Sequence, residues 1–213
     1  MRPVGLVGLL IAFFASLALR LVARRLVNAR LGVTHRGRVT AIDWRHELDP
    51  FGAVAALVLG TGWGRAATLD GLGTRGRRLA PVIAGILAPI LVGELLLIAF
   101  RLLYGHTGSL AVADLMAASS DFGYPAQLLL TTAAGMIAFG ALALIPLPPL
   151  DGFALLWHSM RRPGVTAAKI RHVLVDNNIG LVILLFMAIY PFGGSFLTLP
   201  LNLIALPLVL VAW

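Results

Sequence analysis

The stretch that decides the architecture of this chain is LIPLPPLDG, residues 144–152. It closes an apolar, charge-free segment that begins at Pro125 and has the length of a membrane span. Asp151 therefore stands at the mouth of a membrane-length segment. Ionisable side chains at such depth are costly and usually functional, which makes Asp151 the first candidate site residue.

The composition is that of an integral membrane protein. Of the 213 residues, 59% are hydrophobic and only 12% are charged, with a mean hydropathy of +0.93. Soluble domains carry about 25% charged residues. The net charge is +8, but most arginines lie in short loops beside apolar segments, so we expect membrane lipids rather than nucleic acid as partners. The chain has no cysteine, which excludes disulfides and thiolate metal sites.

The apolar segments predict an all-α polytopic protein with a single membrane domain over residues 1–213. Spanning helices are predicted at about 3–23, 79–103, 125–148 and 179–190. Segment 51–63 is short, and we expect it to be re-entrant and to line the bundle interior. The apolar piece 197–213 either returns or lies along the bilayer surface. Pro200 and Pro207 argue against a regular helix there.

The arginines also predict an orientation. They concentrate in the loops 24–45, 64–78 and 150–176, whereas residues 104–124 contain no lysine or arginine. Because positive residues stay inside, the three basic loops are expected in the cytoplasm of a bacterial cell, whose cytoplasmic membrane would hold the protein. The basic stretch 157–171 is expected to lie on the anionic cytoplasmic leaflet.

Three stretches resemble, in order, the site-2 protease family of intramembrane zinc metalloproteases, in its compact bacterial branch. They are residues 37–52, with His46, Asp49 and Pro50; residues 62–65, Gly-Trp-Gly-Arg; and residues 143–152, with Pro146, Pro148, Pro149, Asp151 and Gly152. The resemblance implies a site-2-protease-like helical bundle, a short cytoplasmic β-hairpin over residues 33–48, and Asp151 as the family's third zinc ligand.

The chain departs from this family in its first helix. The family carries His-Glu-x-x-His there, whose histidines hold zinc one helical turn apart and whose glutamate activates water. Counting back from Val22-Ala23-Arg24-Arg25 puts Ala15-Ser16-Leu17-Ala18-Leu19 in that place, and the sequence contains no His-x-x-x-His pair. We therefore predict no catalytic residue, no metal and no cofactor.

Arg20, Glu94 and Asp151 are the candidate buried charges. Such charges need a partner or must change protonation. We hypothesise that Arg20 partly refills the emptied zinc cradle by pairing with Asp151 or Glu94. The alternatives are that Arg20 snorkels to the cytoplasmic interface and that Asp151 caps a helix starting near Gly152.

Three functions remain open on the sequence alone. The first is a catalytically degenerate site-2-protease-like protein, a pseudoenzyme serving as a structural or accessory subunit among other integral membrane subunits. The second is an active intramembrane metallopeptidase with unorthodox ligands, His46, Glu47 and Asp151, which alone would require zinc. The third is an ion or proton path component that uses Arg20, Glu94 and Asp151.

Overall fold

The described part of the chain is a helical membrane protein. The computed structural model describes residues 3–32, 48–65, 75–106, 109–117, 122–160, 163–189 and 197–212. Within these ranges there is no β-strand, and an isolated antiparallel bridge joins Leu48 to Gly64. The prediction of an all-α polytopic membrane protein is confirmed. The predicted β-hairpin over 33–48, with His46 and Glu47, lies outside the described residues except for Leu48.

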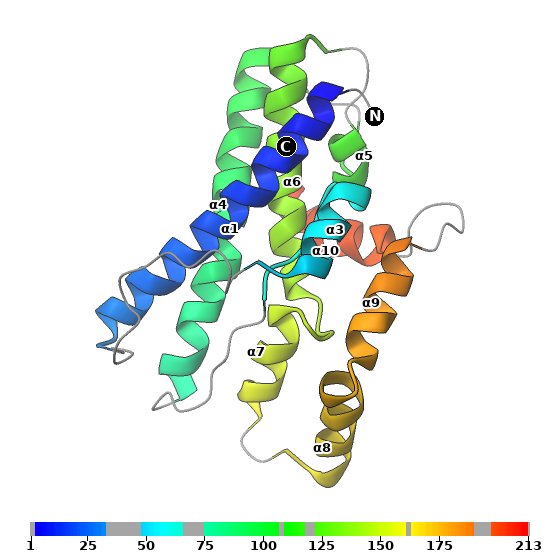
Figure 1. Cartoon of the computed structure of the whole chain (residues 1–213). Helices are drawn as coiled ribbons and strands as arrows, with labels where there is room; N and C mark the ends of the chain where they lie inside the picture. The colour runs from blue at the N-terminus through cyan, green and yellow to red at the C-terminus, as the bar shows by residue number, and fades with distance from the viewer. Residues whose placement is uncertain are drawn as a thin grey trace.

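Three long helices form the central bundle: α1 (Pro3–Arg30), α4 (Arg75–Tyr104) and α6 (Tyr124–Leu144) (Figure 1). Each is long and apolar enough to cross a membrane, and each pair of the three is in extensive contact. The structure extends the predicted helix 3–23 to Arg30 and begins the helix predicted at 79 at Arg75. Flanking polar residues can continue a helix beyond the apolar span, so hydropathy alone underestimates its length.

Helix α6 lies at the centre because its small residues allow close approach. A side chain at Gly135 would lie 2.7 Å from Ala12 Cβ on α1, and one at Gly140 would collide with Ile90 on α4. Residues 133–143 of α6 are all buried. Small residues at contact positions are the usual means of packing membrane helices. On the sequence alone, Gly135, Gly140 and the alanine-rich run Thr131–Ala143 already suit close helix packing, and the structure confirms this.

The segment predicted as re-entrant folds back on itself. Helix α3 (Pro50–Leu59) begins with Asp49 as N-cap and ends at Gly60, whose φ is +78°. Residues 61–65 then return along α3, and a Cβ at Gly52 would clash with the backbone carbonyl of Trp63. The helix thus occupies only part of the predicted range 51–63. Its depth in a bilayer stays a prediction.

The segment predicted as a helix over 125–148 ends earlier. Helix α6 stops at Leu144, and residues 145–150 form turns before α7 (Asp151–Ser159). Pro146, Pro148 and Pro149 explain the difference, because proline has no N–H to donate and disfavours helical backbone before it. The turn carries the chain back so that α7 starts close to the end of α6.

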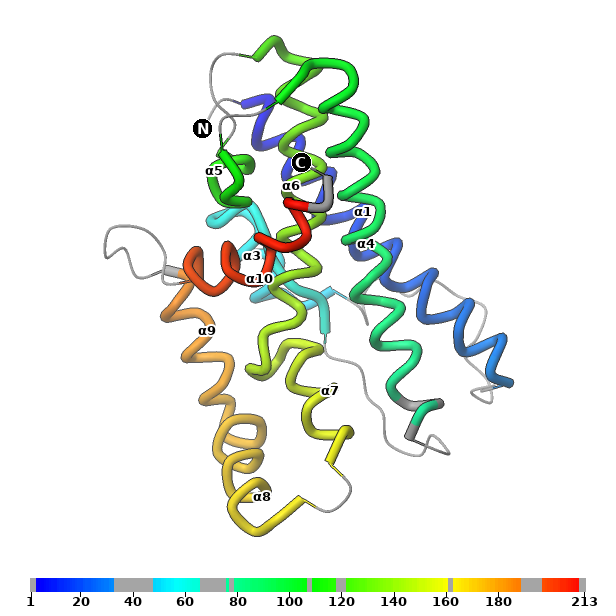
Figure 2. Tube along the Cα trace, turned by 180° about the vertical axis from the view of Figure 1, so that it is seen from behind, coloured from blue at the N-terminus to red at the C-terminus, as the bar shows by residue number. Residues whose placement is uncertain are grey.

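The basic region predicted as a loop over 150–176 is largely helical. After α7 come α8 (Val165–Arg171) and a π-helical turn, η1 (His172–Asp176). Helix α9 (Ile179–Ile189) follows at a bend of 64°. These three form an arm whose α8 end projects away from the bundle, while α9 packs against α3 and buries Leu184 and Ala188 in the main hydrophobic cluster (Figures 1 and 2). A fourth span exists only if the two sides of the bend are counted together.

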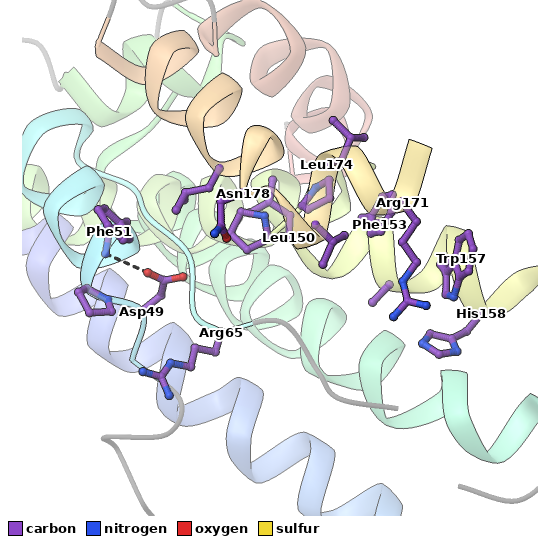
Figure 3. Close-up of a pocket in the computed structure, with 16 residues that line it drawn as sticks. Asp49, Phe51, Arg65, Leu150, Phe153, Trp157, His158, Arg171, Leu174 and Asn178 are labelled. Atoms are coloured by element: carbon purple, nitrogen blue, oxygen red, sulfur yellow. Dashed lines mark hydrogen bonds between the residues drawn. The ribbon is translucent and has the colours of Figure 1, made fainter. Parts of the chain in front are cut away.

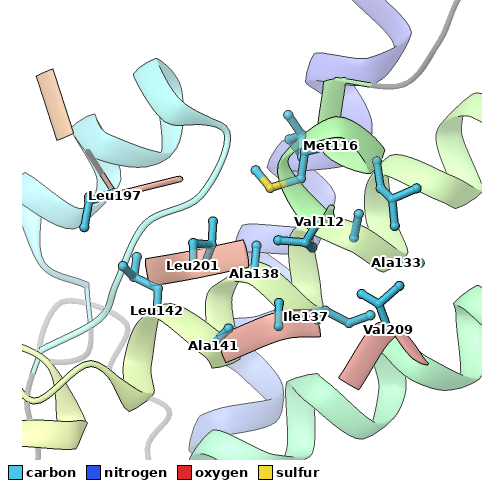
Figure 4. Close-up of a cluster of buried hydrophobic side chains, with 14 of the residues drawn as sticks. Val112, Met116, Ala133, Ile137, Ala138, Ala141, Leu142, Leu197, Leu201 and Val209 are labelled. Atoms are coloured by element: carbon cyan, nitrogen blue, oxygen red, sulfur yellow. The ribbon is translucent and has the colours of Figure 1, made fainter. Parts of the chain in front are cut away.

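The expectation against a helix in 197–213 is wrong, because α10 covers Thr198–Ala212. Pro200 lies in the first turn, where its missing N–H costs nothing, and packing holds the helix at Pro207. Helix α10 lies across α6 and also contacts α5 (Val112–Ala117) (Figures 2 and 4). Leu201, Ala205 and Val209 are buried there, and Asn202 Oδ1 accepts a hydrogen bond of 3.0 Å from the Ala113 amide.

Candidate functional site

Asp151 is held in the interior at the start of α7. Its side chain is 1% exposed, and the helix N-cap is Leu150 rather than Asp151. A Cβ at Gly152 would collide with the carbonyls of Leu144 and Ile145, so glycine is what lets α7 begin this close to α6. The proline-rich turn and Gly152 together therefore aim the Asp151 carboxylate into the bundle. The alternative of a helix-capping side chain is not what the structure shows.

Two arginines of α1 bind this carboxylate. Arg20 Nη2 lies 2.8 Å from each oxygen of Asp151, and Arg24 Nη2 lies 2.7 Å from Oδ2. The side chains of Arg20 and Arg24 are 3% and 11% exposed. The hypothesised pairing of Arg20 with Asp151 is thus present, and Arg20 does not snorkel outward. A buried, hydrogen-bonded ion pair of this kind is the way an interior tolerates such charges.

Arg20 also joins the bundle to the returning segment after α3. The same Nη2 donates a hydrogen bond of 2.6 Å to the backbone carbonyl of Arg65. Within the described residues, Arg20 Nε and Nη1 have no acceptor, nor has the indole N–H of Trp63. These two side chains, with Asp151, line a cavity of about 10 Å³. That is the scale of space needed for one water molecule.

The face of α1 that meets Asp151 runs through Arg20 and Arg24, four residues apart, and continues back to the buried Ser16. Positions 16 and 20, one helical turn apart, are therefore the buried pair on this face, one residue on from the pair 15 and 19 that the motif count suggested. Neither position carries a metal-binding side chain in this chain.

The described residues around Asp151 do not fit a zinc ion. A dication beside Asp151 would meet two guanidinium groups bound to the same carboxylate, so two positive charges already oppose one negative charge. Across the described ranges, no three His, Cys, Asp or Glu side chains gather as a potential metal site. Zinc sites in proteins need three or four such ligands.

The other candidate residues lie apart from this ion pair. Glu94 is buried in α4, and its Oε2 has no hydrogen-bond partner among the described residues. Asp49 caps α3 by accepting from the amides of Phe51 (2.9 Å) and Gly52 (3.4 Å), with Pro50 at the first helical position. Arg24 and Arg65 were missed as site residues; the spacing of four from Arg20 could have indicated Arg24.

A groove of about 560 Å³ lies next to the ion pair, and we call it the arm groove. Its walls come from α7, from the arm (α8, η1 and α9), from the 148–150 turn and from residues at the start of α3. Figure 3 shows Arg171, Trp157 and His158 together at one end and Arg65 beside Asp49 at the other. Arg65 and Leu150 line the groove, and both also touch the ion-pair region.

Fold and site together define a polytopic helical membrane protein in which two arginines of α1 bind a buried aspartate, Asp151, at the start of α7. The chain is similar to a protein of Bacillus subtilis (strain 168) described as "Putative zinc metalloprotease YwhC". The two are 29% identical over 200 residues, which cover 91% of this chain and 85% of that protein. No family model and no solved structure matches the chain. The similarity is consistent with the resemblance to the site-2 protease family that the motifs indicated.

Proposed function

We propose that this protein is a catalytically degenerate member of the site-2-protease-like group that acts as a structural or accessory subunit of a membrane complex. The observation that carries the proposal is the pair of guanidinium groups on Asp151. Metal-assisted peptide hydrolysis needs a cation that lowers the pKa of a bound water. Here the carboxylate that the resemblance assigns to that cation is neutralised by arginine.

The ion pair supports a structural role for the same position. It ties α1 to the start of α7, and through the Arg65 carbonyl it also ties α1 to the segment returning from α3. A metal ion bound between α1 and Asp151 would likewise join α1 to the start of α7. The scaffold is thus kept while its means of hydrolysis is replaced by a fixed internal contact.

The location follows from the same reasoning. Three membrane-length helices support an integral membrane protein. We place it in a bacterial cytoplasmic membrane, with the arginine-rich loops in the cytoplasm, on the positive-inside rule. Accessory action then means lateral contact with other integral membrane subunits. The partner's chemistry is left to the experiment.

The test is gentle purification of the tagged full-length chain from its native membrane, with zinc measured on the same sample. We expect a stable membrane partner and zinc far below one ion per chain. A monodisperse monomer without a partner would contradict the accessory role. One zinc per chain, lost in Asp151→Ala but kept in the exposed control Asp114→Ala, would instead establish the metallopeptidase alternative.

A further inference from the structure

The arm groove has the size and lining of a ligand site. Its volume of about 560 Å³ lies within the range of small-molecule pockets, about 300–1,000 Å³. Most lining side chains are apolar, among them Leu150, Phe153 and Leu174. In Figure 3 these three lie between the two polar ends. A ligand that fits this lining is largely apolar and carries its polar group at one end.

The polar end at α7 and α8 is cationic. The Arg171 guanidinium stacks over the Trp157 ring, 4.9 Å from its centroid, and His158 lies beside them (Figure 3). A stacked guanidinium keeps its in-plane N–H groups at the ring edge, in the geometry that binds phosphate. Asp49 is the one carboxylate among the lining residues, and its Oδ1 accepts hydrogen bonds at the start of α3. The lining therefore favours an anion.

The arm has the character of a helix at a membrane surface. Val165 and Ile170 on α8 are 76% and 51% exposed, and Lys169 and Arg171 lie on the same short helix. Basic helices with exposed apolar residues bind at the level of anionic headgroups. The cationic end of the groove is on this arm, so a lipid phosphate can reach it without leaving the headgroup layer.

The walls favour a lipid over an extended protein segment. Much of the lining comes from α7, α8, η1 and α9, whose backbone groups are largely engaged within the helices. An extended peptide lying there would bury its own N–H and C=O groups with few backbone partners. An acyl chain has no such groups to satisfy.

We propose that the arm groove binds one anionic phospholipid, with its phosphate at Arg171 and one of its acyl chains along Phe153 and Leu174. The groove does not include Arg20 or Asp151, although Arg65 and Leu150 border both, and the proposal does not depend on the function proposed above. Lipid would then have two roles for this protein: bulk lipid surrounds it in the bilayer, and one lipid molecule binds at a specific site.

The experiment uses the purified full-length chain in detergent, offered equal amounts of phosphatidylglycerol and phosphatidylcholine with identical acyl chains. Native mass spectrometry counts the lipids that stay bound as collision energy rises. We expect one phosphatidylglycerol to persist preferentially, and Arg171→Gln to lower its retention about fivefold. The matched control is Lys169→Gln, which removes the same charge from the same helix outside the groove lining and should leave retention unchanged.

A second measurement identifies the occupant in native membranes. The photoreactive substitution Phe153→p-benzoylphenylalanine should give an adduct with the mass of a phospholipid, reduced in combination with Arg171→Gln. Equal retention of the two lipids, or equal losses in the Arg171 and Lys169 variants, would overturn the proposal. A polypeptide adduct at position 153 would overturn it in favour of a protein segment.

Discussion

Removing the Asp151 carboxylate should destabilise the protein more than any other single charge change described here. The substitution Asp151→Leu leaves Arg20 buried, with its side chain 3% exposed, and takes away its only carboxylate among the described residues. Arg24 is 11% exposed and lies nearer the end of α1, so its charge is the less costly of the two to leave without Asp151. Breaking a buried pair by removing one partner costs about 3–5 kcal/mol. We expect a loss of that size.

The double variant separates charge from shape. Replacing Arg20 as well, in Arg20→Met with Asp151→Leu, removes the more deeply buried of the two stranded guanidinium groups, and exchange of a buried pair for apolar residues is often neutral. We therefore expect the double variant to be more stable than Asp151→Leu alone, which is the coupling a double-mutant cycle measures. The control is Asp176→Asn, which breaks an exposed pair with His172 and should cost at most about 1 kcal/mol.

The assay is reversible unfolding of the full-length protein in mixed micelles, from which the free energy of unfolding of each variant is obtained. If Asp151→Leu lowers the free energy of unfolding no more than Asp176→Asn does, the claim that the Asp151 ion pair holds the bundle together is refuted. A double variant less stable than Asp151→Leu would refute the claim that a stranded charge causes the loss.

Two further predictions concern packing and metal. Gly140→Ala places a methyl group against Ile90 and 3.2 Å from the Ile86 carbonyl oxygen, and should lower the free energy of unfolding by about 1–3 kcal/mol in the same assay. Gly76→Ala, whose methyl meets nothing within 4 Å, should cost nothing; equal effects would contradict close α4–α6 contact as the cause. The triple variant Ser16→His, Arg20→His and Arg24→Gln should take up zinc with Asp151 as third ligand, measured as metal per chain after dialysis. Equal uptake with Arg24 retained would show that guanidinium repulsion does not exclude the ion.

The sequence predicted the parts of the fold that hydropathy controls. The three long helices were expected from their apolar length, and close packing around α6 was expected from Gly135 and Gly140. The ends were less predictable. Helix α6 stops at Leu144 because three prolines follow, whereas Pro207 does not stop α10, which contacts α4, α5 and α6. A proline's effect on a helix depends on tertiary contacts that the local sequence does not contain.

The site was predictable only where one contact followed from one motif. The pairing of Arg20 with Asp151 could be hypothesised because the resemblance put both beside a lost metal position. The arm groove could not be predicted, since its lining joins residues as distant as Asp49 and Asn178. The helical spacing of four that adds Arg24 was present in the sequence, but its meaning depends on which face of α1 turns toward α7.

Arg65 belongs both to the surroundings of the Arg20–Asp151 ion pair and to the arm groove. Its carbonyl oxygen accepts the 2.6 Å hydrogen bond from Arg20, and its side chain lies at one end of the arm groove (Figure 3). A displacement of Arg65 would therefore change both the ion-pair contact and the groove. Coupling between two equilibria is reciprocal. If a lipid bound in the arm groove favours the Arg20–Asp151 contact by a given factor, that contact raises the affinity for the lipid by the same factor. The surrounding bilayer would then act as an effector, its headgroup content adjusting the rigidity of the protein's interior.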